Sequence, residues 1–190
     1  MKLLAVVGSP RKGGNTDILV DRMIEGAKTR GAEVEKVYLN DLSIRPCQGC
    51  DGCMKKNAKG CILKDDMIPL HESLKACDAL IIGTPVYWFS LSAQTKLFMD
   101  RWYCLVVPGT KGPEYYIKGK RFAVAMAYGD TNLTTSGGAN ALGTFRDAAA
   151  FSGLDFVGIV HGTAGAKGDI ASNRALLDEA YELGKKLCSE

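Results

Sequence analysis

The 190-residue sequence has no hydrophobic run that approaches the length of a membrane-spanning helix, about 18 residues. The apolar run at its start, residues 1–7, stops at Gly8, after too few residues for the apolar region of a secretion signal. We therefore expect a cytoplasmic protein that has no membrane as a partner.

An excess of charge of one sign is also lacking. The 24 Lys and Arg residues and 21 Asp and Glu residues leave a net charge of +3, and the basic residues are scattered. Nucleic-acid binding needs a concentrated basic surface, so we expect no nucleic-acid partner. The chain also lacks internal repeats, low-complexity tracts and linkers, and its length predicts a single domain over residues 1–190.

Apolar runs typical of strands alternate along the chain with segments of helical periodicity. The expected strands are 2–7, 33–39, 79–83, 121–127 and 156–161. The expected helices are one from Asn15 or Thr16 up to Gly31 and those at 65–75, 92–102, 138–152 and 170–187. Residues 105–119, rich in Gly, Pro and Lys, are expected to form a surface loop. This alternation predicts an α/β fold with a parallel sheet and helices on both faces.

Ligands of such sheets bind where the strands end, at their carboxyl edge. The loop after the first expected strand reads GSPRKGGNT, residues 8–16. Its glycines let backbone N–H groups approach an anion, and the following helix N-terminus favours negative charge. Ser9, Asn15 and Thr16 add side-chain donors, and Arg11 and Lys12 add positive charge. These features predict a phosphate site, with an ordinary glycine-rich turn as the alternative.

Two other phosphate motifs do not fit this loop. A Walker A loop requires a lysine where this chain has Gly14, and the dinucleotide fingerprint requires a glycine where it has Pro10. A single phosphate monoester therefore fits better than a diphosphate.

The stretch GSPRKGGNT resembles the FMN phosphate loop of the NADPH-dependent FMN reductase and iron–sulfur flavoprotein families. The similarity continues through DDM at 65–67, GTPVYW at 83–88 and KLFMDR at 96–101, and beyond these it rests on topology. The resemblance implies a flavodoxin-like three-layer sandwich with strand order 2-1-3-4-5, bound FMN, and NAD(P)H as an electron donor. Lys96, Asp100 and Arg101 recur in the family but serve equally well as structural charges.

The second and third strand-end loops suit a flavin ring. Pro85, Val86, Tyr87 and Trp88 combine a rigid turn with aromatic side chains, so backbone N–H groups can bind the pyrimidine while an aromatic side chain covers the ring. The alternative is that these aromatics close the core or a dimer contact. Tyr128 and Gly129 match the family's third flavin loop less closely, and we expect both beside the ring.

Cysteine is plentiful but odd in number, seven in all, which disfavours a disulfide framework. Four cysteines, in a cysteine-rich insertion at about 45–64, follow the pattern C-x2-C-x2-C-x7-C: Cys47, Cys50, Cys53 and Cys61. Four thiolates this close predict a [4Fe–4S] cluster, with zinc or free redox-active thiols as alternatives. Nearby basic residues could offset its charge: Arg45, Lys55, Lys56, Lys59 and Lys64. We expect packing roles for Cys77, Cys104 and Cys188 and structural roles for His71 and His161.

Iron–sulfur flavoproteins carry a motif of this kind at this place in the fold. The resemblance therefore implies an FMN oxidoreductase that passes electrons between NAD(P)H or ferredoxin, FMN, the cluster and an acceptor, with no catalytic side chain. It also implies a homodimer or homotetramer. The alternatives are a cluster-free NAD(P)H-dependent FMN or quinone reductase, a flavodoxin-type electron carrier, and a flavin-binding regulatory module.

Overall fold

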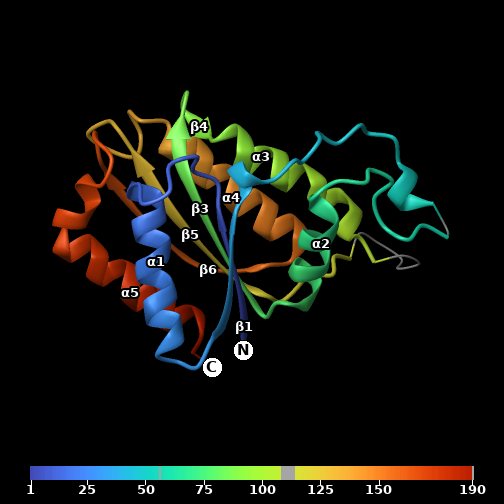
Figure 1. The fold of residues 1–190 in the computed structure, drawn as a ribbon, viewed down its shortest axis with the longest axis horizontal. Helices are drawn as coiled ribbons and strands as arrows, with labels where there is room; N and C mark the ends of the chain where they lie inside the picture. Colours follow the sequence, from blue (N-terminus) through green and yellow to red (C-terminus); the bar gives the residue numbers. More distant parts are fainter. Residues whose placement is uncertain (56, 108–113, 190) are drawn as a thin grey trace.

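A computed structural model of the chain describes residues 1–55, 57–107 and 114–189. Its sheet has five parallel strands, β1 (Lys2–Val7), β2 (Glu33–Tyr38), β3 (Ala79–Tyr87), β5 (Arg121–Tyr128) and β6 (Asp155–Thr163). Their order is β2-β1-β3-β5-β6, which confirms the predicted flavodoxin-like topology (Figure 1). A sixth strand that the sequence did not predict, β4 (Ser90–Leu91), pairs antiparallel with the end of β3.

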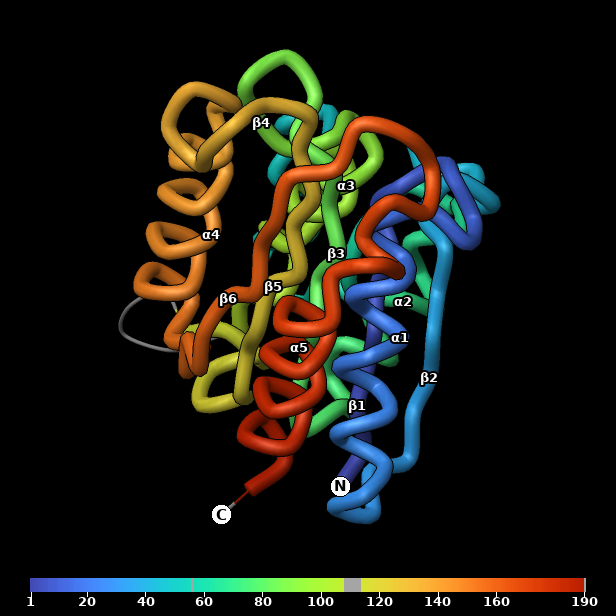
Figure 2. Tube along the Cα trace, turned by 90° about the vertical axis from the view of Figure 1, so that its left-hand side faces the viewer, coloured from blue at the N-terminus to red at the C-terminus, as the bar shows by residue number. Residues whose placement is uncertain are grey.

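In the described part of the chain, five α-helices cover the two faces of the sheet. Helices α1 (Asn15–Lys28) and α5 (Arg174–Leu187) lie together on one face, which Figure 2 shows toward the viewer. Helices α2 (Met67–Ala76), α3 (Ala93–Asp100) and α4 (Gly138–Ser152) cover the other. Short 3-10 helices occupy 39–41, 52–54, 101–105 and 169–172. Among the described residues, no helix is both long enough and apolar enough to cross a membrane.

Alternation along the buried strands explains the three layers. In β1, Leu4 and Val6 face the core under α2, α3 and α4, whereas Leu3, Ala5 and Val7 face the core under α1 and α5. Successive side chains of a strand point to opposite faces, so a strand that is apolar throughout must be covered on both sides. The sheet therefore lies between two separate hydrophobic cores.

Two expected helices end or begin differently in the structure. The segment 92–102 begins as predicted, with the Ser92 hydroxyl capping the Thr95 N–H at 3.2 Å, but it tightens into a 3-10 helix from Arg101. The segment 170–187 is wrong as one helix, because Asn173 interrupts it. The Asn173 side chain accepts from the Leu176 N–H at 3.1 Å, and an asparagine in this position starts a new helix rather than continuing one.

The expected surface loop at 105–119 is partly wrong. Leu105, Tyr115 and Ile117 are buried in the α2/α3/α4 core, and Val106 pairs with Tyr115 in an isolated bridge. These apolar side chains lie among polar residues at both ends of the segment. The free energy gained by burying them fixes the two ends against the core, although the composition of the segment is typical of a loop. Residues 108–113 of this prediction lie outside the described residues.

Candidate functional site

A cavity opens at the carboxyl ends of the parallel strands and brings four loops together. It is lined by Ser9, Arg11, Asn15, Thr16, Pro85, Val86, Tyr87, Ala127, Tyr128, Gly129, Ala164, Gly165 and Lys167. Every residue predicted to hold the flavin is in this set except Lys12 and Trp88. The fourth loop, with Ala164, Gly165 and Lys167, was missed. It follows the end of β6, so the strand-end rule that selected the other three loops could have found it.

The loop between β1 and α1 is held in place by hydrogen bonds among its own residues and to Asp17. Gly13 has a φ of +67°, and its N–H donates to the Asp17 carboxylate at 2.7 Å. The Arg11 N–H donates to the Ser9 hydroxyl at 3.2 Å, which fixes the turn before the helix. Ser9 and Thr16 are buried in the protein and line the cavity, so their hydroxyl groups are placed at the helix N-terminus.

Gly8 is packed so closely that no larger residue fits. A Cβ at this position would lie 1.8 Å from the Thr95 hydroxyl oxygen. The Ser92 hydroxyl donates to the Gly8 carbonyl at 2.7 Å, and Thr84 and Thr95 complete a buried group of hydroxyls. Residues at the start of α3 therefore pack against the loop between β1 and α1 and hold it in place.

The Asn15 side chain joins two loops of the cavity. Its amide donates to the Ala166 carbonyl at 2.7 Å and its oxygen accepts from the Ile170 N–H at 3.2 Å. Asn15 therefore holds the fourth loop against the first. Its two partners lie 151 and 155 positions later in the chain, so the sequence could not indicate this role.

Lys12 points away from the cavity. Its ammonium group pairs with Asp41 at 2.5 Å and lies 4.9 Å from the centre of the Tyr38 ring. The hydrogen bond that Lys12 donates to Asp41 is the main cause of the raised pKa of Lys12. Arg11 and Lys167 are the basic residues that line the cavity, and Lys12 is not among the lining residues.

Trp88 lies outside the cavity, on an adjoining hollow that shares Val86, Tyr128 and Gly129 with it. Trp88 and Phe89 form the two-residue turn between β3 and β4, with φ values of +46° and +62°. Such turns normally use Asn-Gly, because both central residues need positive φ. Contact with Gly137 and a 3.2 Å hydrogen bond from Asn140 to the Phe89 carbonyl hold this turn, which leaves Trp88 93% exposed.

His161, which does not line the cavity, forms a hydrogen bond with the cavity residue Tyr128. The Tyr128 hydroxyl and His161 Nδ1 are 2.8 Å apart, and burial raises the pKa of the Tyr128 phenol. The structural role expected of His161 is therefore to orient one of the predicted flavin neighbours.

The cysteine-rich insertion leaves the sheet between the 3-10 helix at 39–41 and α2, and it extends past α2 and α3 in Figure 1. Cys47, Cys50, Cys53 and Cys61 line one small cavity. Among residues 1–55, 57–107 and 114–189, no three His, Cys, Asp or Glu side chains converge as metal ligands. The four thiols fit an iron–sulfur cluster in kind and number, while burial and the neighbouring thiols raise the pKa of Cys53. Lys56 of this insertion lies outside the described residues.

Cys104 lines the same cavity, so its predicted role as a packing residue was incomplete. Its sulfur lies 3.2 Å from His71 Nε2, and burial raises the pKa of its thiol to about 12. His71 is buried, its ring nitrogen is 3.0 Å from the Arg101 carbonyl, and its pKa is lowered mainly by burial. Cys104 lies 43 positions after Cys61 in the sequence, and the 3-10 helix after α3 places it beside the insertion.

Arg101 and Asp65 form a buried ion pair beside the cysteine cavity, with side chains 1% and 4% exposed. The closest guanidinium–carboxylate distance is 2.6 Å. Burial alone would raise the pKa of Asp65, but hydrogen bonds from Arg101 and from the N–H groups of Arg45 and Met67 lower it overall. By contrast, Lys96 and Asp100 pair in the open on α3.

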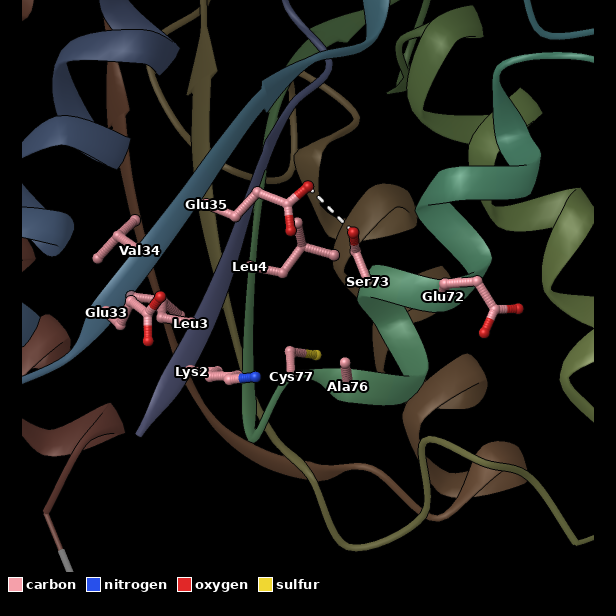
Figure 3. Close-up of a pocket in the computed structure, with 10 residues that line it drawn as sticks. All are labelled: Lys2, Leu3, Leu4, Glu33, Val34, Glu35, Glu72, Ser73, Ala76 and Cys77. Carbon is pink, nitrogen blue, oxygen red and sulfur yellow. Dashed lines mark hydrogen bonds between the residues drawn. The ribbon is translucent and has the colours of Figure 1, made fainter.

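A further cavity lies at the opposite end of the sheet, between β2 and α2 (Figure 3). Glu33, Glu35 and Glu72 border it, and the Ser73 hydroxyl donates to Glu35 at 3.0 Å across the gap. This contact ties α2 to the edge strand. The cavity is remote from the carboxyl ends of the strands, and we assign it no binding role.

Comparison with known proteins agrees with this geometry. Residues 1–167 match the family model described as NADPH-dependent FMN reductase. An iron-sulfur flavoprotein of Archaeoglobus fulgidus is 39% identical over 101 residues, which are 53% of this chain and 45% of that protein. A putative NAD(P)H-dependent FMN-containing oxidoreductase of Bacillus subtilis is 29% identical over 195 residues, with 98% of each chain covered.

Among solved structures, an NAD(P)H:quinone oxidoreductase from Methanothermobacter marburgensis superposes with a TM-score of 0.77 at 19% identity, over 100% of this chain and 98% of that one. This likeness supports the flavodoxin-like fold. The match to the iron-sulfur flavoprotein of A. fulgidus spans about half the length of that relative. On the match over residues 1–167, the chain belongs to the NADPH-dependent FMN reductase family.

Proposed function

We propose that the chain is an FMN-containing oxidoreductase that passes electrons between NAD(P)H or ferredoxin, FMN, a [4Fe–4S] cluster and an acceptor. The observation that carries this proposal is the presence, in one chain, of a four-loop cavity at the carboxyl edge of the sheet and a second cavity lined by cysteines. Bound FMN would supply both hydride and single-electron transfer.

The residues of the first cavity would bind and orient FMN without acid–base catalysis. Ser9, Thr16 and the backbone N–H groups of their loop suit the phosphate, and Arg11 and Lys167 suit its charge. The chain from Pro85 to Tyr87 and the ring of Tyr128, held by His161, suit the flavin ring.

The four cysteines of the insertion would hold the cluster. Their side chains share one cavity, and exposed basic residues neighbour them in the sequence, namely Arg45, Lys55, Lys59 and Lys64. Positive charge offsets the negative charge of a thiolate-bound cluster and favours an acidic protein such as ferredoxin as the electron donor. The seven cysteines are all described and none forms a disulfide, which fits a reducing cytoplasm.

Protein purified without oxygen is expected to contain iron and acid-labile sulfide in stoichiometric amounts beside FMN. Cys53→Ser is expected to lose the iron and keep the FMN, because Cys53 lines the cysteine cavity and not the strand-end cavity. Cys188→Ser, at the end of α5, is the matched control and should keep both. Elemental analysis and the visible spectrum of one sample give the answer; FMN without iron in the unmutated protein would contradict the cluster.

A cluster-free NAD(P)H-dependent FMN or quinone reductase is the second candidate. The observation that favours it is that, in the described part of the chain, the cysteine side chains do not converge as ligands. Rapid bleaching of the flavin by NAD(P)H in iron-free protein would support this candidate, whereas reduction by ferredoxin alone, slowed by added salt, would support the cluster. A flavodoxin-type carrier would stabilise the semiquinone and show no turnover.

We also propose that the protein forms a homodimer or homotetramer through the turn between β3 and β4. Trp88 and Phe89 are exposed there with their ring centres 6.3 Å apart, and exposed apolar surfaces mark protein interfaces. The double variant Trp88→Asn/Phe89→Gly is expected to shift the protein toward monomer in light scattering at micromolar concentration. Because Asn-Gly suits positive φ at both positions, this change should not unfold the turn. A monomeric unmutated protein would contradict the proposal.

A further inference from the structure

The Arg101 guanidinium has three sets of partners, and one of them is a cysteine. Arg101 Nη1 donates to Asp65 and, at 2.8 Å, to the Arg45 carbonyl. Arg101 Nη2 donates to Asp65 at 3.1 Å and to the Cys61 sulfur at 3.3 Å. A buried guanidinium must have its donors satisfied, and its planar fork can serve a carboxylate and a sulfur together.

These contacts fasten both ends of the cysteine-rich insertion to the α/β core. Arg45 precedes the first cysteine and Cys61 is the last, while Arg101 begins the 3-10 helix that follows α3. At the other end of α3, the capping residue Ser92 donates to the Gly8 carbonyl and so supports the strand-end cavity. Arg101 therefore fixes the position of Cys61 relative to an element that belongs to the core of the fold.

The bond to sulfur has a chemical consequence wherever Cys61 ligates a cluster. Hydrogen bonds and positive charge at the ligating sulfurs stabilise the reduced, more negative state of an iron–sulfur centre. Arginine stays protonated in proteins, so this donor is permanent. Lysine has no fork, and an ammonium group that pairs with Asp65 would not also serve the Cys61 sulfur in the same geometry.

We propose that Arg101 is a positioning residue for the cysteine site, which holds Cys61 in place and raises the reduction potential of the cluster by donating a hydrogen bond to its sulfur. This inference rests on the proposed cluster at Cys47, Cys50, Cys53 and Cys61. The ion pair with Asp65 by itself would give Arg101 only a structural role. The hydrogen bond to Cys61 adds a role in electron transfer.

The test is a redox titration of the cluster, followed by EPR, in the intact protein and in Arg101→Lys. The variant is expected to keep iron and FMN but to titrate at a lower potential, by about a tenfold change in the equilibrium constant, which is ~59 mV for one electron. Lys64→Gln is the matched control. It removes an exposed positive charge three positions after Cys61 and should shift the potential much less.

Each outcome decides between the two proposals. Unmutated protein without iron defeats the cluster itself, whereas equal potentials in iron-containing Arg101→Lys and unmutated protein defeat only the role of Arg101. Should Arg101→Lys hold no iron, the double variant Asp65→Asn/Arg101→Gln removes both buried charges, and a lowered potential in it supports the proposal. Loss of iron from both variants would overturn the role of Arg101 in setting the potential, because Arg101 would then serve only to hold the site together.

Discussion

Replacing Asp65 by alanine is expected to lower the free energy of unfolding by about 3–5 kcal/mol, because it leaves a buried arginine without its counter-ion. The Arg101 and Asp65 side chains are 1% and 4% exposed, so water cannot take over the lost interaction. Asp65 also accepts from the Arg45 N–H at 3.0 Å and the Met67 N–H at 3.2 Å, and both bonds would be lost. Urea unfolding of the protein without bound groups would measure the change.

The exposed ion pair between Lys96 and Asp100 on α3 supplies the control. Asp100→Ala removes the partner of Lys96, whose side chain is 54% exposed, and should cost no more than about 1 kcal/mol. Similar costs for Asp65→Ala and Asp100→Ala would contradict the importance of burial. A changed slope of the unfolding curve would instead indicate an altered unfolded state.

The pH dependence of Asp65→Ala follows from the same pair. The pKa of Asp65 is lowered in the folded protein, so the folded state gains stability from the ionised carboxylate above its ordinary pKa of 3.8. As the pH falls below 3.8, the unfolded chain binds a proton at Asp65 before the folded protein does, and the contribution is lost as the pH falls through the lowered pKa of the folded state. The difference in stability between the unmutated protein and Asp65→Ala is therefore expected to shrink in acid.

The fold was largely predictable because its signals are local and repeated. Apolar runs such as 2–7 and 79–83 form strands covered on both sides, and the alternation of strands and helices predicts a parallel sheet. The resemblance of the phosphate loop to a known family then implied the strand order. The two-residue strand β4 was not predictable, because it depends on a turn in which Trp88 and Phe89 take a conformation that their residue types disfavour.

The site was predicted less completely, because side-chain directions depend on distant partners. Lys12 turns toward Asp41, 29 positions later, and Asn15 turns toward a loop more than 150 positions away. Cys104 joins the cysteine cavity because the 3-10 helix after α3 carries it there. The residue types in the loop between β1 and α1 predict a phosphate site, whereas the packing between loops decides which of these residues line the cavity.

Removing two hydroxyl groups from the phosphate loop is expected to weaken FMN binding by at least about a hundredfold. Ser9 and Thr16 line the cavity where α1 begins, and a hydrogen bond to a charged group contributes about 1.5–3 kcal/mol. In Ser9→Ala/Thr16→Val both donors are gone, while valine keeps the shape of threonine beside Gly83. Two lost bonds of about 1.5 kcal/mol each correspond to that factor, measured by fluorescence titration of the flavin.

Riboflavin separates the phosphate from the ring in the same experiment. It lacks the phosphate, so its affinity should be nearly equal in the unmutated protein and in Ser9→Ala/Thr16→Val. Thr144→Val, on α4 and outside the cavity, should leave both affinities unchanged. An equal loss for FMN and riboflavin would show that the two hydroxyls support the cavity as a whole. An unchanged FMN affinity would mean that the phosphate binds elsewhere, and the loop from Gly8 to Thr16 would then be a turn in which Gly8 serves close packing against α3.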